Sequence, residues 1–291
     1  MIETERANKN SFNMDKMSAR GLANLISKED FNAARAVSSA KKEIALAADK
    51  TAKIFAAGGN IIFIGAGTSG RLGVLEAVEC YPTFSLEPGR VKGIMAGGKS
   101  AVFKSKEGAE DDGAQGAGDI CKAAKKGDIV FGLSASGGAA YVLSALAAAK
   151  KIKAFTVLIC CNKEIKKTAA DIIIYLPTGP EVLQGSTRMK AGSATKMALN
   201  IITTSAMALN GKIYKNLMVD VKASNKKLRA RAERLVQNTA GVDEKTARTF
   251  LKLADYKVKT VIVMLKKKVN KRAAEILLKK QNGFLGKALN E

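Results

Sequence analysis

An apolar run that ends in a glycine-rich turn constrains the fold of this chain most strongly. Residues 61–64 read Ile-Ile-Phe-Ile, too short for a helix and β-branched enough for a strand buried on both faces. Residues 65–70 read Gly-Ala-Gly-Thr-Ser-Gly, and apolar residues then recur at helical spacing. The order strand, loop and helix would direct backbone N–H groups and the hydroxyls of Thr68 and Ser69 to one place, which suits a phosphate.

Three kinds of ligand site can be considered for this loop, and they differ in what else the chain must contain. Its letters match G-x-G-x-x-G, the pattern of dinucleotide sites, but the next strand-like run ends in Gly97-Gly98-Lys99 and offers no acidic residue for a ribose hydroxyl. A nucleotide P-loop would need Gly-Lys followed by Ser or Thr, which this loop lacks. Two alternatives remain. One is a sugar-phosphate site, which uses hydroxyl side chains as well as glycines, and the other is a glycine-rich turn that binds no ligand.

Composition narrows the class of protein. The chain has 291 residues, 47% of them hydrophobic, which is enough for one large α/β domain with an appendage. It has no histidine, so a Ser-His-Asp triad and histidine metal sites are excluded. Its four cysteines show neither metal-ligand nor disulfide spacing and are expected to be reduced core thiols. No apolar segment reaches the roughly 18 residues of a membrane span, and no signal sequence opens the chain, so we expect a cytoplasmic protein.

The formal net charge of +23 raises the question of nucleic-acid binding. Lysines are spread through every segment, without the interleaved aromatic residues on which single-strand binders stack bases. The densest basic run, residues 266–272, is typical of a solvated helix face. We therefore expect a small phosphate-bearing substrate and neither a nucleic-acid nor a membrane partner.

Five strand-like runs alternate with helical patterns along the chain. They are residues 61–64, 91–96, 128–133, 154–160 and 171–176. This alternation predicts an α/β fold, a five-stranded parallel sheet flanked by helices, with ligands at the carboxyl ends of its strands. A second hydroxyl-rich turn, Ser134-Ala135-Ser136-Gly137, follows the third run. The predicted phosphate-binding residues are therefore Gly67, Thr68, Ser69, Ser134, Ser136 and Gly137.

Three parts are predicted along the chain: an N-terminal arm (1–28), a phosphosugar-binding domain (29–236) and a small C-terminal helical module (237–291). The polar arm is expected to pack on a second subunit. Pro82 is expected to end the first loop's helix near Glu79, because proline disfavours helical geometry in the residue before it. The run 256–264 fits either a helix or a strand.

Five segments resemble the N-acetylmuramic acid 6-phosphate etherase family of the sugar isomerase domain superfamily. They are residues 64–73, 79–84, 107–111, 185–192 and 216–221. The resemblance runs from about Thr4 to the C-terminus and implies a sugar isomerase domain. It also implies cleavage of the D-lactyl ether of N-acetylmuramic acid 6-phosphate, by elimination and then hydration, without metal or other cofactor. Glucokinase regulatory protein is similar in its domains, so a non-catalytic phosphosugar-sensing regulatory protein is the alternative.

The family motifs imply catalytic roles for two carboxylates, Glu79 and Glu110. At the end of the loop helix, the negative pole of the helix dipole would favour protonated Glu79, as a general acid requires. Asp111 and Asp112 would favour proton uptake by Glu110, as a base requires. Other predicted substrate contacts are Glu181, Ser186, Thr187 and Arg188. We also expect a homodimer with the site near its subunit interface.

The chain departs from the family pattern in the second hydroxyl turn. Where the family has Arg-Thr-Pro, this chain has Gly138-Ala139-Ala140. Losing a hydroxyl near a phosphate would cost about 1 kcal/mol or more of binding, and losing the proline loosens the entry into the following helix.

Overall fold

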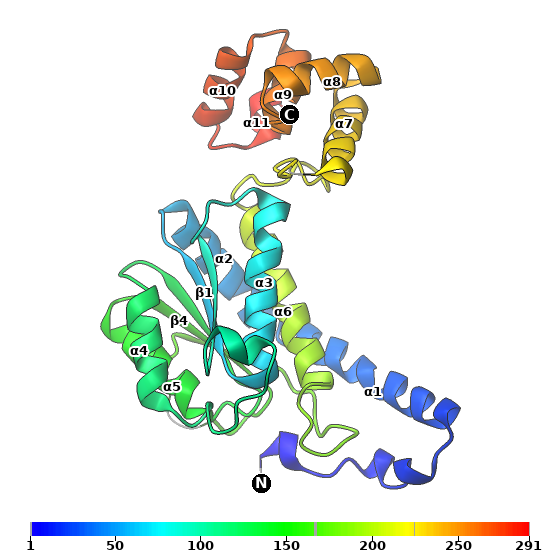
Figure 1. The fold of residues 1–291 in the computed structure, drawn as a ribbon, viewed down its shortest axis with the longest axis vertical. Helices are drawn as coiled ribbons and strands as arrows, with labels where there is room; N and C mark the ends of the chain where they lie inside the picture. The colour runs from blue at the N-terminus through cyan, green and yellow to red at the C-terminus, as the bar shows by residue number, and fades with distance from the viewer. Residues whose placement is uncertain (1, 166–167, 224, 291) are drawn as a thin grey trace. The chain divides into compact units, whose positions relative to one another are not determined.

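The computed structural model describes residues 2–165, 168–223 and 225–290, and Figure 1 shows their helices and strands as a ribbon. The chain divides into two compact units. The N-terminal unit holds Met1–Val78 and Gly89–Thr203, and the C-terminal unit holds Glu79–Pro88 and Thr204–Glu291. The second unit thus begins earlier than the predicted boundary at residue 237. Among the described residues, no helix has both the length and the apolar character that crossing a bilayer requires.

A five-stranded parallel sheet forms the centre of the N-terminal unit, which confirms the predicted α/β fold. Its strands, in spatial order, are β2 (Val91–Met95), β1 (Ile61–Gly65), β3 (Ile129–Leu133), β4 (Phe155–Cys160) and β5 (Ile172–Tyr175). All five predicted strands are confirmed. Every residue of β1 and β3 is buried, as expected for parallel strands covered on both faces.

The strand order reverses at β1, which pairs with β2 on one side and β3 on the other. Gly65 at the end of β1 lies opposite Leu133 at the end of β3. The loops that follow these two strands therefore begin side by side. Such a reversal opens a crevice at the carboxyl ends of the strands, where α/β proteins bind ligands.

Helices cover both faces of this sheet. The N-terminal unit contains α1 (Ala19–Ser39), α2 (Lys41–Ala56), α4 (Gly113–Ala123) and α5 (Ala140–Lys151), while α3 (Gly67–Phe84) and α6 (Lys190–Ala208) begin in it. Helices α4 and α5 share a buried cluster with Ile62 and Ile64 of β1. Helix α3 packs on the other face, where a Cβ on Gly73 would lie 2.8 Å from the Cβ of Phe63.

Two predicted helix boundaries were wrong. The predicted arm (1–28) already contains the start of a helix, since α1 begins at Ala19, where the side chain of Ser18 caps it by accepting the N–H of Gly21. Helix α3 continues past Pro82 to Phe84. Proline already has a helical φ and removes one hydrogen bond, so a last turn tolerates it, and left-handed Ser85 (φ 47°) then ends the helix.

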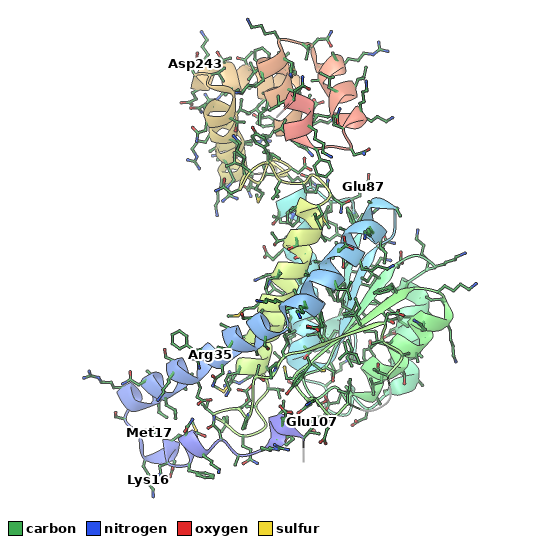
Figure 2. All side chains as sticks on the ribbon, turned by 180° about the vertical axis from the view of Figure 1, so that it is seen from behind. Lys16, Met17, Arg35, Glu87, Glu107 and Asp243 are labelled. Atoms are coloured by element: carbon green, nitrogen blue, oxygen red, sulfur yellow. The ribbon has the colours of Figure 1, made fainter. Side chains whose placement is uncertain are left out.

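The N-terminal segment consists of short 3-10 turns: η1 (Glu3–Glu5), η2 (Lys9–Ser11) and η3 (Met14–Lys16). Another such turn, η4 (Lys99–Val102), follows β2. Lys16 and Met17 mark the place where the segment turns into α1 (Figure 2).

The C-terminal unit is helical, as predicted for the end of the chain. It contains α7 (Lys226–Ala240), α8 (Glu244–Leu253), α9 (Val258–Lys267), α10 (Lys271–Lys280) and α11 (Leu285–Leu289). Helix α9 buries Val261, Ile262 and Val263 completely. Residues 260–264 are buried in succession. A short continuous apolar run fits a buried strand as well as a helix, and this is why the sequence left this run open between the two.

Candidate functional site

The loops after β1 and β3 enclose a hollow of about 230 Å³, which we call the hydroxyl pocket. Its lining residues are Glu5, Ala66, Gly67, Thr68, Ser69, Glu110, Leu133, Ser134, Ala135, Ser136, Ala139, Gly185 and Thr187. The fold thus brings together both predicted hydroxyl loops, one predicted catalytic carboxylate and one predicted contact from the segment before α6.

Glycines allow the first loop to pass directly from strand to helix. A Cβ on Gly65 would lie 2.8 Å from the backbone nitrogen of Gly70, and a Cβ on Gly70 would lie 2.5 Å from the carbonyl oxygen of Gly65. Gly67, which starts α3, has a left-handed φ of 53°. The positive end of α3 therefore opens at the pocket, beside the hydroxyls of Thr68 and Ser69.

The second loop carries its hydroxyls on a tight turn. The Oγ atoms of Ser134 and Ser136 lie 3.3 Å apart, and the Ser136 hydroxyl accepts the N–H of Gly138 at 3.2 Å. Gly137, at φ 70°, forms the turn but does not line the pocket, and a Cβ there would lie 2.4 Å from a methyl carbon of Ile165. Ala139 is the N-cap of α5 and provides no capping side chain. The N-terminus of α5 thus faces the pocket without a side-chain cap from its N-cap residue.

Glu110 is exposed, and its backbone is fixed. Its carbonyl oxygen accepts the N–H of Tyr141, in the first turn of α5, at 2.9 Å. Glu110 also lines an adjoining hollow of about 300 Å³ together with Arg71 and Lys106. The guanidinium of Arg71 fixes the turn after β2 by donating hydrogen bonds to the carbonyl oxygens of residues 101 and 102. Glu110 therefore stands where the two hollows meet.

The carboxylate of Asp112, expected to act beside Glu110, faces elsewhere. It caps α4 by accepting the N–H of Gln115 at 2.8 Å. One of the two aspartates that were predicted to favour proton uptake by Glu110 is therefore hydrogen-bonded to the N-terminus of α4.

The pattern in the sequence did not reveal that the N-terminal segment forms a wall of the pocket. Buried Thr4 donates its N–H to Asn162 at 3.1 Å, and the Asn162 side chain donates to the carbonyl oxygens of Ala135 and Ser136. Asn162 thus joins the segment to the second hydroxyl loop. The arm predicted to pack on a second subunit is held, at these residues, by its own chain.

A buried ion pair anchors the same segment to two helices. Lys190 of α6 and Glu29 of α1 lie 2.5 Å apart, with side chains 2% and 9% exposed. Asn8 and Asn10 of the segment also donate to the Glu29 carboxylate. Burial alone would raise the pKa of Glu29, but the bonds from Lys190, Asn10 and Asn8 lower it to about 2.

The remaining predicted contacts lie in different surroundings. Glu181 is completely buried, and its carboxylate accepts the N–H groups of Lys190 and Ala191, so it caps α6 inside the unit. Burial raises the pKa of Glu181. Neither Ser186 nor Arg188 is among the described residues that line the hydroxyl pocket.

Glu79 is an exposed residue of α3. Its carbonyl oxygen accepts the hydroxyl of Thr83 at 2.7 Å. Since α3 ends at Phe84, Glu79 is not at the helix end where the sequence placed it. One turn earlier, buried Glu76 accepts the hydroxyl of Thr203 at 2.6 Å and pairs with Lys196, which ties α3 to α6. The catalytic role of Glu79 stays a prediction.

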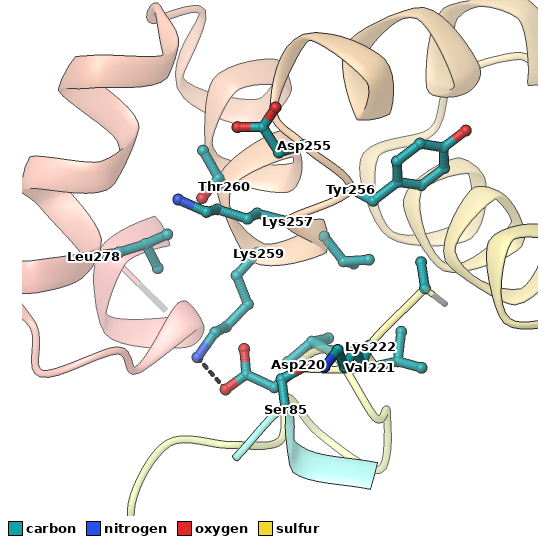
Figure 3. A pocket seen from close by; sticks show the side chains of 13 residues that line it. Ser85, Asp220, Val221, Lys222, Asp255, Tyr256, Lys257, Lys259, Thr260 and Leu278 are labelled. Carbon is teal, nitrogen blue, oxygen red and sulfur yellow. Dashed lines mark hydrogen bonds and ion pairs between the residues drawn. The ribbon is translucent and has the colours of Figure 1, made fainter. Parts of the chain in front are cut away.

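The C-terminal unit contains a hollow of about 430 Å³, shown in Figure 3. The Nζ of Lys259 donates to Asp220 at 2.8 Å and to the carbonyl oxygens of Gly211 and Gly283. Lys212 also pairs with Asp220. Lys259 and Asp220, which both line this hollow, thus connect loops of the unit to α9.

Three of the four cysteines, Cys80, Cys160 and Cys161, are buried, and Cys121 is exposed. Burial raises the pKa of Cys160 to about 11 and that of Cys161 to about 12, which favours the protonated thiol over the thiolate at neutral pH. In the described ranges, no His, Cys, Asp and Glu side chains gather in a group of three that would hold a metal.

Comparisons with known proteins agree with this architecture. Three family models match the chain: the glucokinase regulatory protein N-terminal SIS domain over residues 43–150, the SIS domain over 110–205, and the C-terminal lid domain of glucokinase regulatory protein over 215–281. The solved structure of the protein c3406 from Escherichia coli CFT073 superposes with a TM-score of 0.50 at 17% identity. It covers 69% of this chain and 97% of that one, and supports the fold alone.

Full-length relatives identify the family. The N-acetylmuramic acid 6-phosphate etherase of Oenococcus oeni is 43% identical over 293 residues, which are 100% of this chain and 98% of the relative. The etherase of Bacillus subtilis is 44% identical over 291 residues, which are 99% of this chain and 95% of the relative. The chain therefore belongs to the N-acetylmuramic acid 6-phosphate etherase family.

Proposed function

We propose that this chain is a carbon–oxygen lyase of cell-wall sugar recycling. It cleaves the D-lactyl ether of N-acetylmuramic acid 6-phosphate to N-acetylglucosamine 6-phosphate and D-lactate, by elimination and then hydration. The relatives that match nearly all of the chain carry this activity in their names. The observation that carries the proposal is the meeting of two hydroxyl loops, two helix N-termini and Glu110 around one pocket.

The 6-phosphate binds in the hydroxyl pocket. The hydroxyls of Thr68, Ser69, Ser134 and Ser136 donate to its oxygens, and the positive ends of α3 and α5 stabilise its charge. Thr187, Ser186 and Arg188 add polar contacts to the rest of the substrate. Hydroxyls and helix ends bind the dianion while leaving the carboxylates free for proton transfer.

The two glutamates move the protons of the elimination. Glu110 removes the proton from C2, which is acidic because it lies beside the aldehyde of the open-chain sugar. The C–O bond on the neighbouring carbon breaks, a double bond forms, and Glu79 protonates the departing lactate oxygen. Water then adds across the double bond, giving a hydroxyl where lactate left and returning a proton to C2.

We propose that the enzyme works as a cytoplasmic homodimer, with its site near the subunit interface. Phe12 and, on α1, Phe31 are 68% and 63% exposed, and burying these rings against a second copy would favour association. A charged sugar phosphate does not cross a bilayer, so the enzyme meets it in the compartment where it is phosphorylated. Sedimentation should show a dimer, and a fully active monomer would contradict this.

Incubation of the purified protein with N-acetylmuramic acid 6-phosphate, with D-lactate followed over time, tests the activity. Release supports the lyase. Saturable binding without release would favour the phosphosugar-sensing regulatory protein, and neither binding nor release would contradict both.

A variant at Ser134 tests the phosphate site. Ser134→Ala should weaken binding of N-acetylglucosamine 6-phosphate by about 10-fold and leave binding of unphosphorylated N-acetylglucosamine unchanged, because one hydrogen bond to phosphate is lost. Equal losses for the two sugars, measured by calorimetry, would place this serine's role elsewhere.

A further inference from the structure

The carboxylate of Glu5 lies in the hydroxyl pocket, although Glu5 is more than 60 residues away in the sequence from any of the loops around it. Its backbone is held, since the Gln184 side chain donates to the Glu5 carbonyl oxygen at 2.9 Å. Its neighbour Thr4 is buried and donates its N–H to Asn162, whose side chain donates to the Ser136 carbonyl oxygen in the second hydroxyl loop. The position of Glu5 in the pocket is therefore built into the fold.

Gly185 leaves room for this carboxylate. A Cβ on Gly185 would lie 3.1 Å from a carboxylate oxygen of Glu5, and the left-handed φ of 74° at Gly185 also disfavours a side chain there. The segment before α6 thus has its smallest residue where the Glu5 carboxylate comes closest.

A negative charge in this place does not suit a phosphate ligand, because like charges repel. In the described part of the chain, no hydrogen bond to the Glu5 carboxylate is found, whereas the Glu3 carboxylate accepts the Tyr175 hydroxyl at 2.7 Å. The oxygens of Glu5 are thus open to a donor that enters with the ligand. Sugars offer hydroxyl and amide donors of this kind.

We propose that Glu5 is a substrate-binding residue which accepts a hydrogen bond from a hydroxyl or amide N–H of the sugar while the hydroxyl loops bind its phosphate. Glu5 then selects a sugar phosphate over a bare phosphate. This assignment rests on the proposed phosphosugar activity of the same pocket.

Calorimetric titration of the full chain with two probes, N-acetylglucosamine 6-phosphate and inorganic phosphate, tests it. Glu5→Ala should weaken the sugar phosphate on the order of 10- to 100-fold, because a charge-assisted hydrogen bond is lost. Inorganic phosphate should bind equally or a few-fold more tightly, since a repelling charge is gone. Glu5→Gln, which keeps an acceptor oxygen, should lose less. Glu3→Gln, two residues away in the same turn, removes an equal charge outside the pocket and should change neither affinity.

Three results would overturn the proposal. Equal weakening of both probes by Glu5→Ala would mean that Glu5 only holds the segment. No change in either probe, or tighter binding of the sugar phosphate, would mean that Glu5 makes no contact with the sugar. Wild-type protein that neither binds the sugar phosphate nor releases lactate would remove the proposed function itself, a failure distinct from the loss of selectivity alone.

Discussion

The backbone carbonyl of Glu110 accepts a hydrogen bond from the N–H of Tyr141 at 2.9 Å. This bond joins the loop that carries the proposed base to the first turn of α5, whose N-terminus opens at the hydroxyl pocket. Helix α4 supports the junction from behind, because Gly116 lies against the backbone of Tyr141. The proposed base and the phosphate site are thus positioned by one helix pair.

Gly116→Ala should disturb that junction. A Cβ on Gly116 would lie 2.1 Å from the carbonyl oxygen of Tyr141, so α4 and α5 must separate, at a cost of about 1–3 kcal/mol of unfolding free energy. Lactate release should fall as Glu110 shifts. Gly118→Ala is the matched control on the same helix, since a Cβ there meets nothing within 4 Å, and it should stabilise α4 by up to about 1 kcal/mol. Urea unfolding that gives the same sign for both variants would contradict this packing.

Ala139→Thr should restore a cap to α5. Ala139 is the N-cap residue and makes no side-chain capping bond. Because the N–H of Tyr141 is already bonded to Glu110, a hydroxyl at residue 139 should accept the N–H of Val142 and stabilise the protein by about 1 kcal/mol. Ala139→Val has the shape of threonine without its oxygen and serves as the control. Denaturant unfolding should separate the two variants, and equal stability would show that the hydroxyl finds no donor.

The buried pair of Glu29 and Lys190 predicts a loss of stability in acid. The pKa of Glu29 is lowered from 4.5 to about 2 in the folded protein, so its contribution is full above pH 4.5 and is lost as the pH falls toward 2. That contribution is on the order of 3 kcal/mol.

Glu29→Gln should therefore destabilise the protein at pH 7 by about 3 kcal/mol and by progressively less below pH 4.5, because it leaves Lys190 buried without its anion. Asp30→Asn changes an exposed neighbour on the same helix and should stay within about 0.5 kcal/mol. A destabilisation by Glu29→Gln that is constant from pH 7 to pH 3 would show that the pair's charge is unimportant.

The alternation of apolar runs was enough to predict the sheet, because parallel strands buried on both faces are short, continuous and β-branched. The hydroxyl loops followed, because parallel strands end at one edge of a sheet. Glu5 could not be found in this way. Thr4 meets Asn162 across 158 positions of the chain, and no local pattern encodes such a contact. The one available signal was that the family resemblance begins at about Thr4.

The burial of individual polar residues and the exact helix ends also could not be predicted from the sequence. Glu181 precedes α6 in a polar segment and suggested a ligand contact, yet it caps the helix from inside. Pro82 suggested a helix end, but a proline in a last turn costs one hydrogen bond, and α3 continues through it. In both places tertiary packing decided between outcomes that local chemistry allows equally.

Substitution of Glu79 and substitution of Glu110 should affect different steps of the reaction. Glu79→Ala should stop lactate release but still exchange the C2 hydrogen of the substrate with deuterated solvent, because exchange needs only the base. Glu110→Gln should lose both processes, slowing them on the order of 10²–10⁴-fold, since an amide cannot accept the proton. Proton NMR of the C2 position follows the exchange. Loss of exchange in Glu79→Ala with its retention in Glu110→Gln would reverse the two roles.

The wild-type reaction with N-acetylmuramic acid 6-phosphate in deuterated water tests the central claim most directly. Elimination followed by hydration predicts D-lactate together with N-acetylglucosamine 6-phosphate that carries deuterium at C2. D-lactate released with a product that keeps its original C2 hydrogen would contradict the elimination, and no lactate at all would contradict the lyase activity.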